Sequence, residues 1–490
     1  MTHVDTPQSV CQFAIARGDI TPPAGIYHRM WGAAAHDRAE GVHRPLTATV
    51  AIFQATNAEP SPEIRQVVIA LDHCVMGRAE IDLLLEAVCQ TPGLDRESVL
   101  VVFSHTHAAG LMLLDRKDLP GGDLIAGYLA DVAARLAELA ATASQNLQPA
   151  TISYGTARCD MAGHRDFWDQ QSGQFVCGFN PSGKGDDTVL VARVSGAGDQ
   201  TLATVVNYAC HPTTLAWDNR LVSPDFPGAM REVVEDATGA PCLFIQGASG
   251  DLGPKDGYVG DVEVADRNGR QLGYAALSTL ASLPAAGTRF QYVGPVVSGA
   301  TIGAWSHVPL PPERRERLAQ WRLRRWAIEI DYRPELPSRE EAEAEHARWL
   351  ADEQAALDAG QTERAQDCRA MVERQRRLLA RLAALPEGRS YPLQIVLWRM
   401  GGAVWVVVQG EPYNLLQRSL RERFAGLPIV VATVANNWGP SYLPPAELYG
   451  KGIYQESIAV LAAGCLERLI DQIGEQIAVL APEANPSAAR

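Results

Sequence analysis

The stretch VLVVFSHTHAAG, residues 99–110, decides how the rest of the sequence is interpreted. It opens with an uninterrupted apolar run, which predicts a strand buried on both faces. His105 and His107 follow the run, and side chains two residues apart on an extended chain point to the same side. If extended geometry continues this far, both imidazoles project from the carboxyl end of a core strand, where α/β sheets bind ligands. Such a pair can hold a metal, act as ligand and base, or simply hydrogen-bond to backbone carbonyls.

The composition is typical of a globular protein with a large core. Of 490 residues, 47% are hydrophobic and 20% are charged. This length favours two to four domains or one large α/β unit. The net charge of −14 argues against nucleic acid or an anionic membrane as a partner, because both would repel this surface.

The cysteines and the N-terminal sequence predict a cytoplasmic location. The nine cysteines are scattered singly without a CxxC pair, which is typical of reduced thiols. The first residues lack a basic region followed by a long apolar run, so no secretion signal is expected. No stretch approaches ~18 consecutive apolar residues, so no integral membrane segment is expected either.

Strands and helices alternate along most of the chain. A strand at 67–71, an amphipathic helix around Leu84 and the strand at 99–103 form a βαβ unit with parallel strands. The strands at 188–194 and 201–208 flank a hairpin loop, which adds antiparallel pairing. Further strands are predicted at 47–54, 151–154, 242–246, 393–398, 404–408 and 429–434. The sequence therefore predicts an α/β fold with a large mixed sheet core flanked by helices.

Residues 305–385 differ from the rest, because Arg, Glu, Ala and Leu dominate and helical periodicity is strong. Two or three long helices, broken at 333–337 and near Gly360, predict a helical hairpin. We interpret it as an insertion that serves as a lid or as the arm of a homodimer. The catalytic domain would then comprise residues 1–304 and 386–480, and residues 481–490 would form a tail.

A potential ligand follows an apolar strand at two further points, His211 and Glu411. Together with His105 these residues give two nitrogens and one oxygen, a set suited to zinc. Each residue alone is more commonly structural, and the repetition is what favours a metal site. The glycine-rich loop GASGDLGP, residues 247–254, is neither a phosphate loop nor a nucleophile elbow. Asp251 stands where the second glycine of G-x-S-x-G belongs, which disfavours a serine hydrolase.

These motifs, in this order, resemble the neutral ceramidases, and more closely the catalytic domain that they share with shorter bacterial relatives. The resemblance covers about residues 13–475 and is interrupted by the helical segment. The motifs are GDITPP at 18–23, EGVH at 40–43, SHTH at 104–107, ACHPT at 209–213, GDLGP at 250–254, GEP at 410–412 and SYLPP at 441–445.

The resemblance implies one zinc ion per chain and a set of site residues. The metal ligands would be His105, His211, Glu411 and Tyr442. His107 would act as the base beside the metal, and Arg165 and Tyr454 would flank the scissile group with Tyr442. A substrate pocket would be completed by His43, Asp72, Ser249, Asp251 and Gly253.

The sequence also departs from the ceramidases. Gly253 stands where they have a serine, and residues 108–112 lack their Gly-Pro-Gly-Gly run. Neither their carboxy-terminal immunoglobulin-like domain nor a secretion signal is expected, so ceramide is not the expected substrate. The hypothesis is a zinc-dependent hydrolase that cleaves an amide bond, in an N-acyl or related small-molecule acyl substrate, by a metal-activated water. The alternatives are an ester or lactone hydrolase using the same site, and a non-catalytic, metal-bearing binding protein, which Gly253 would favour.

Overall fold

The structure is a computed structural model that describes residues 2–56 and 61–482. Its core contains two mixed β-sheets that pack face to face through a shared hydrophobic cluster. In this cluster the ring of Phe53 in the larger sheet lies 5.2 Å from that of Trp398 in the smaller one. The larger sheet has the strand order β14-β12-β11-β7-β2-β4-β5-β6, and the smaller sheet the order β18-β19-β20-β22.

The strands of the two sheets have the following bounds. The larger sheet comprises β2 (Gln8–Asp19), β4 (Thr47–Gln54), β5 (Arg65–Leu71), β6 (Val99–Phe103), β7 (Gln148–Arg158), β11 (Thr188–Ser195), β12 (Thr201–Tyr208) and β14 (Cys242–Gln246). The smaller sheet comprises β18 (Trp321–Asp331), β19 (Ser390–Met400), β20 (Ala403–Val408) and β22 (Ile429–Ala432).

Strand β6 is buried on both faces, as the apolar run predicts. Alternate side chains of this strand, such as Val101 and Val102, belong to different hydrophobic clusters, one beneath helices and one between the sheets. Strand β6 pairs in parallel with β5, and β11 pairs with β12 in an antiparallel hairpin, so both predicted pairings are confirmed. A strand buried on both faces needs apolar residues at successive positions, because its alternate side chains enter different hydrophobic clusters.

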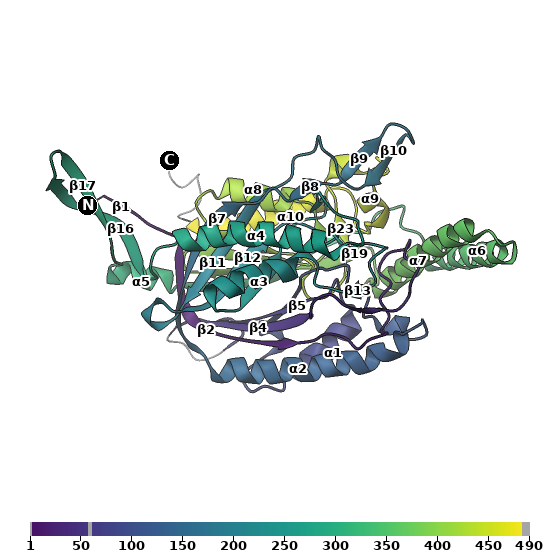
Figure 1. Cartoon of the computed structure of the whole chain (residues 1–490), viewed down its shortest axis with the longest axis horizontal. Helices are drawn as coiled ribbons and strands as arrows, with labels where there is room; N and C mark the ends of the chain where they lie inside the picture. Colours follow the sequence, from purple (N-terminus) through teal and green to yellow (C-terminus); the bar gives the residue numbers. More distant parts are fainter. Residues whose placement is uncertain (1, 57–60, 483–490) are drawn as a thin grey trace.

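Helices cover the outer face of each sheet. One half of the larger sheet packs against α1 and α2, and the other half packs against α3 and α4. The smaller sheet packs against α8 and α10. Figure 1 shows α2 running beneath β2 and β4. The predicted α/β class, a mixed sheet core flanked by helices, is confirmed. These helices are α1 (Arg78–Val88), α2 (Ile125–Gln145), α3 (Phe226–Thr238), α4 (Val262–Ser282), α8 (Leu415–Arg423) and α10 (Cys465–Leu480).

The segment 305–385 contains a strand as well as helices, so the expectation of helix over its first part is wrong. Strand β18 pairs with β19 along its whole length, from Trp321 opposite Met400 to Asp331 opposite Ser390. Its apolar residues alternate with charged ones in the sequence IEID at 328–331, a period of two that the Arg- and Glu-rich composition masks. The helices of the segment are α5 (Pro312–Leu318), α6 (Arg339–Asp358) and α7 (Thr362–Ala384).

The predicted helical hairpin is formed by α6 and α7, and its tip projects from the body of the molecule (Figure 1). The chain turns at Gly360, whose φ of 69° lies in the left-handed region that favours glycine. Ion pairs attach α7 to the core: Glu373 accepts from Arg116 at 2.8 Å, and Arg369 donates to Asp37 at 2.6 Å. The base of the hairpin is therefore anchored to the body by buried and half-buried charges.

The remaining elements are short or lie at the periphery. Strands β16 (Thr288–Val297) and β17 (Thr301–Pro309) form a hairpin that pairs with β1 (His3–Val4) and projects at the end opposite α6 (Figure 1). In the described residues no helix is long and apolar enough to cross a membrane. All nine cysteines are described, and they are free thiols. Most of the predicted tail, residues 483–490, lies outside the described residues. The other elements near the site are β8 (Ala162–His164), β15 (Leu252–Pro254), β21 (Glu411–Pro412), β23 (Tyr442–Leu443) and α9 (Tyr454–Ile458).

Candidate metal centre

Three polar side chains that follow the ends of β6, β12 and β20 meet at one point. The Nε2 atoms of His105 and His211 lie 3.0 Å apart. The Oε2 atom of Glu411 lies 3.1 Å from Nε2 of His211 and 3.5 Å from Nε2 of His105. All three side chains are buried. Two imidazole nitrogens and a carboxylate oxygen thus face a common centre, and these residues can hold a metal ion.

The hydrogen bonds of the two imidazoles indicate which ring nitrogen carries the proton. Nδ1 of His105 lies 2.8 Å from the carbonyl oxygen of Cys74, and Nδ1 of His211 lies 2.8 Å from that of Ser249. A carbonyl oxygen only accepts, so each Nδ1 donates, and each Nε2 has a lone pair whenever its ring is neutral. Two such lone pairs facing each other at 3.0 Å would repel, so a proton or a metal cation has to lie between them. Metal-binding histidines commonly have this arrangement, with the other nitrogen donating to a carbonyl.

His105 and His107 lie together, but not because the strand continues. Strand β6 ends at Phe103, and His105 has a φ of 66°, in the left-handed region. The expected extended geometry is therefore absent, and a turn places the two rings 5.0 Å apart at an interplanar angle of 88°. Nε2 of His107 is buried and has no hydrogen-bond partner among the described residues. Burial, reinforced by the neighbouring imidazoles, holds the pKa of His107 well below its usual range, so the ring is neutral.

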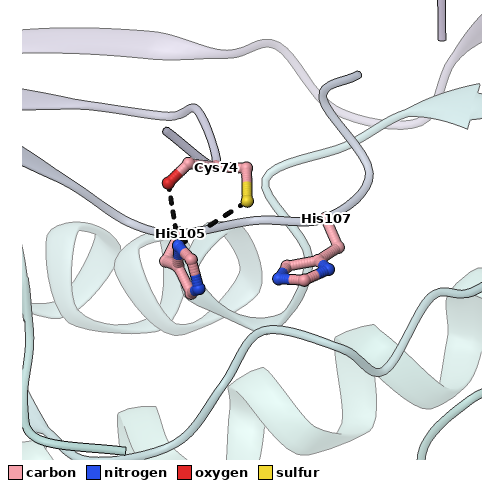
Figure 2. A group of neighbouring side chains, drawn as sticks. All are labelled: Cys74, His105 and His107. Carbon is pink, nitrogen blue, oxygen red and sulfur yellow. Dashed lines mark hydrogen bonds between the residues drawn. The ribbon is translucent and has the colours of Figure 1, made fainter. Parts of the chain in front are cut away.

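A second group of potential ligands, Cys74, His105 and His107, overlaps the first. Figure 2 shows that Nδ1 of His105 points at Cys74, 2.8 Å from its carbonyl oxygen and 3.6 Å from its Sγ atom. That nitrogen is occupied by the hydrogen bond, and the free Nε2 points away from Cys74 (Figure 2). The geometry therefore favours the group that contains His211 and Glu411.

Tyr442 and Arg165 lie beside the three ligands. The two-residue strand β23 pairs in parallel with β21, which sets Tyr442 opposite Glu411. The Tyr442 hydroxyl lies 3.2 Å from Nε2 of His211, and Nη2 of Arg165 donates to the same hydroxyl at 3.1 Å. A second bond from Arg165 to the carbonyl of Gly250, at 2.8 Å, fixes the buried guanidinium. The ring of Tyr454 lies 5.9 Å from that of Tyr442, on the exposed side of the site.

The charges of the site keep Glu411 ionised and His211 neutral. Burial alone would raise the pKa of Glu411, but hydrogen bonds with His105 and His211 hold it well below its usual range. Burial, with Arg165 nearby, lowers the pKa of His211 to about 3. Burial would lower the pKa of His105, but Cys74 and Glu411 raise it well above its usual range, so without a metal this ring holds a proton. A metal ion would replace that proton, since metal binding requires neutral imidazole.

The predicted substrate-pocket residues are not all at this centre. His43 contacts Ser223 at 2.9 Å and Asp266 at 3.3 Å, away from the metal ligands. Asp72 is buried in an ion pair with Arg231 at 2.6 Å. The structure therefore places both side chains outside the cavity in front of the ligands, where they hold loops and α3 in position.

The predicted pocket residues of the glycine-rich loop lie at different places around the metal ligands. The carbonyl of Ser249 accepts from His211, as described above, and its hydroxyl lies 3.2 Å from the same Nδ1 atom. The carboxylate of Asp251 accepts from the backbone of Asn414 at 2.6 Å and faces another hollow. A Cβ atom added at Gly253 would meet Arg165 at 3.6 Å, an ordinary contact, so this position adjoins the site. The loop thus supports the ligands more than it lines the cavity.

A cavity of about 500 Å³ lies in front of the ligands. One wall is aromatic: the ring of Trp31 lies 5.3 Å from that of His107, and 6.0 Å and 5.7 Å from those of Trp217 and Tyr258. Another wall comes from α7. The aromatic wall was not predicted, because its residues lie in irregular loops. The interpretation of residues 305–385 as a lid or dimer arm named no α7 residue, because the charges of this helix are typical of a solvated face. The α7 residues that line the cavity are Ala370, Glu373, Arg374, Arg377 and Arg381.

The fold defines a class of protein: the chain has the fold of the neutral ceramidases. No family model matches the sequence, and no curated protein matches it. Among solved structures, the neutral ceramidase from Pseudomonas aeruginosa is similar, with a TM-score of 0.65 and 17% identity, over 99% of this chain and 76% of that one. A ceramidase complexed with C2 gives a TM-score of 0.64 and 16% identity, over 98% and 76%. The resemblance seen in the motifs is thereby confirmed for the fold.

Proposed function

We propose that the protein is a zinc-dependent amidohydrolase that cleaves the amide bond of an N-acyl or related small-molecule substrate. The observation that supports it most is the pair of imidazole Nε2 atoms, 3.0 Å apart, beside the carboxylate of Glu411. His105, His211 and Glu411 would hold one zinc ion, with the Tyr442 hydroxyl as a fourth ligand. Zinc at such a site lowers the pKa of a bound water from ~15.7 to about 7 and polarises a carbonyl.

In this proposal His107 acts as general base and acid. Its ring lies 5.0 Å from that of His105, and its buried Nε2 has no partner in the described part of the chain. A nitrogen that is free to accept is what the attacking water needs, and the same proton can then pass to the leaving nitrogen. The ring of Trp31 packs against the imidazole and fixes its orientation.

Arg165, Tyr442 and Tyr454 would stabilise the negative charge that develops on the carbonyl oxygen. Arg165 is held by Gly250 and Tyr442, so its donors are already oriented. Losing one preorganised donor of this kind typically raises the barrier by roughly 2.7–4 kcal/mol. Gly253 leaves these groups unobstructed, because it adds no side chain next to Arg165.

Metal analysis combined with a hydrolysis assay tests this proposal. The purified protein is expected to contain about one zinc per chain and to hydrolyse members of a panel of N-acyl amines and N-acyl amino acids, with esters and lactones included for comparison. His105→Ala should lose both metal and turnover. His107→Ala should keep the metal and lose roughly 10²- to 10⁴-fold in turnover.

The control is His307→Ala, which replaces an exposed histidine on the distant β17 and should change neither quantity. A wild-type protein that turns over substrate without metal would refute the zinc assignment. Full turnover by His107→Ala would refute the assignment of the base.

A further inference from the structure

Arg381, on the cavity side of α7, is a buried cation that forms no direct ion pair with any described residue. Its side chain is 8% exposed and lines the cavity. Among residues 2–56 and 61–482 it forms no ion pair, and its Nε has no hydrogen-bond partner. The guanidinium lies over the ring of Trp438, with its Cζ atom 5.9 Å from the ring centroid. Burial lowers the pKa of Arg381 to about 10, so it still carries its charge at neutral pH.

Two neighbouring charges on the same helix, Arg377 and Glu373, are paired. Arg377, one turn earlier, donates to Glu373 at 2.8 Å and to the backbone carbonyl of Met30. Glu373 also accepts two bonds from Arg116 at 2.8 Å. Arg374 also lines the cavity, but it is exposed to solvent, whereas the guanidinium of Arg381 is buried. A buried, unpaired charge destabilises a fold strongly, and such a group in a native protein calls for an explanation such as a bound ion or ligand.

The cavity as a whole is cationic, although the chain is acidic. Its lining contains four arginines and two glutamates, whereas the net charge of the chain is −14. The carboxylate of Glu411 faces His105 and His211, which leaves it turned to the metal centre. A cleft of one charge with low-dielectric walls concentrates ligands of the opposite charge. The cavity thus selects against cationic substrates and favours anionic ones.

There is also room for an anionic group near Arg381. Arg381 and Trp438 line a neighbouring hollow of about 400 Å³ as well as the main cavity. The guanidinium thus stands where the two hollows meet. Its planar fork matches a carboxylate, which can accept two parallel hydrogen bonds.

We propose that the substrate carries a carboxylate in addition to the amide bond that is cleaved, and that Arg381 binds this carboxylate. The proposal rests on the proposed amidohydrolase function and names the substrate class of that site. It distinguishes this protein from an enzyme for uncharged amides, because an uncharged substrate would leave Arg381 unpaired during every turnover. Arg381 is then a specificity-determining residue, and the bond-breaking groups stay those described above.

A series of amides with matched chains tests the proposal. N-decanoylethanolamine is the neutral reference, N-decanoylglycine carries the carboxylate in its amine half, and the monoethanolamide of decanedioic acid carries it at the far end of the acyl chain. For the wild-type protein, kcat/KM for at least one of the two acids is expected to exceed that of the neutral amide by about 10- to 100-fold, the range of a charge-assisted hydrogen bond. Which acid is preferred locates the anionic group relative to the amide.

Variants assign this preference to one side chain. Arg381→Met retains the length and the contact with Trp438 but removes the charge, and it should abolish the preference with little change for the neutral amide. Arg381→Lys should restore part of it. Arg364→Met, an exposed position on the same helix outside the cavity, is the matched control and should behave as wild type. A purely structural role for Arg381 would instead lower kcat/KM for all three amides alike.

Ligand-induced stabilisation gives a readout that needs no turnover. N-decanoylglycine or the decanedioic acid amide should raise the unfolding midpoint of the purified wild-type protein more than the neutral amide does, and Arg381→Met should remove that difference. Equal hydrolysis and equal stabilisation by the acids and the neutral amide would overturn the carboxylate proposal and leave the amidohydrolase function standing. Hydrolysis of none of the amides, with selective stabilisation by an acid, would overturn the function but support the anion site.

Discussion

Replacing Glu411 by glutamine should abolish most of the rise in the unfolding midpoint that zinc produces. The carboxylate is the oxygen among the three facing atoms, 3.1 Å and 3.5 Å from the two imidazole nitrogens. Glutamine has the same shape without the charge, and its amide N–H can donate to an Nε2 lone pair, so the metal-free variant should fold. What it loses is the anionic ligand that favours a divalent cation.

The size of the effect follows from linkage. Zinc at a thousandfold excess over its dissociation constant stabilises the folded state by about 4.1 kcal/mol. With an unfolding entropy of about 2.1 cal/mol/K per residue, 490 residues give about 1 kcal/mol/K. If the chain unfolds in one transition, the unfolding midpoint of the wild type should therefore rise by about 4 °C. The same zinc concentration should shift Glu411→Gln by less than about 1 °C.

The assay is calorimetry on chelator-treated protein, with and without added zinc. Magnesium serves as the control ion, because it prefers a shell of oxygen ligands and should not bind two imidazoles. Equal zinc-induced shifts in wild type and Glu411→Gln would refute the reasoning, and so would equal shifts with magnesium and zinc. Either result would mean that the facing nitrogens and carboxylate do not form the binding site.

Three further outcomes are expected. Cys74→Ala should keep its zinc, since His105 bonds to the backbone carbonyl at 2.8 Å, and loss of metal on elemental analysis would favour the alternative ligand group. Gly253→Ser should change the free energy of unfolding by no more than about 0.5 kcal/mol in urea titrations, because the added Cβ meets nothing closer than 3.5 Å; a larger loss would contradict this spacing. Burial alone would raise the pKa of Glu373, but Arg116 and a second arginine lower it from 4.5 to about 2. This depressed pKa stabilises the folded state above pH 4.5 and is lost as the pH falls toward 2, so Glu373→Gln should cost about 3 kcal/mol at pH 7 and about half that at pH 3. A cost in urea titrations that does not shrink at pH 3 would disprove this account.

The sequence was informative wherever a local pattern determines position. The apolar run at 99–103 identifies a doubly buried strand, and strand ends deliver His105, His211 and Glu411 to one place because their strands lie in packed sheets. Local pattern failed at β18, where alternation is hidden among arginines. It also could not foresee the left-handed turn at His105, since a positive φ in a non-glycine residue is set by tertiary packing.

The cavity walls were beyond sequence reasoning for a different reason. Arg381 is far from the ligands along the chain, and its helix has the charge pattern of a solvent-exposed element. Its burial depends on how α7 docks, through partners such as Arg116 and Asp37 that carry no motif. Contacts of this kind are visible only once the chain is folded.

The α6–α7 hairpin leaves the smaller sheet after β18 and returns at β19, and Asp331 and Ser390 at these two ends are direct neighbours. A hairpin of different sequence can be inserted between them without moving a strand, because the two entry points are already joined by the sheet, provided that it keeps partners for Arg116 and Asp37. The proposed metal ligands and base therefore belong to the two sheets and their loops, whereas Arg381, the proposed specificity-determining residue, belongs to the hairpin. In a protein built this way, exchanging one hairpin can change the substrate specificity while the metal ligands and the base stay in place.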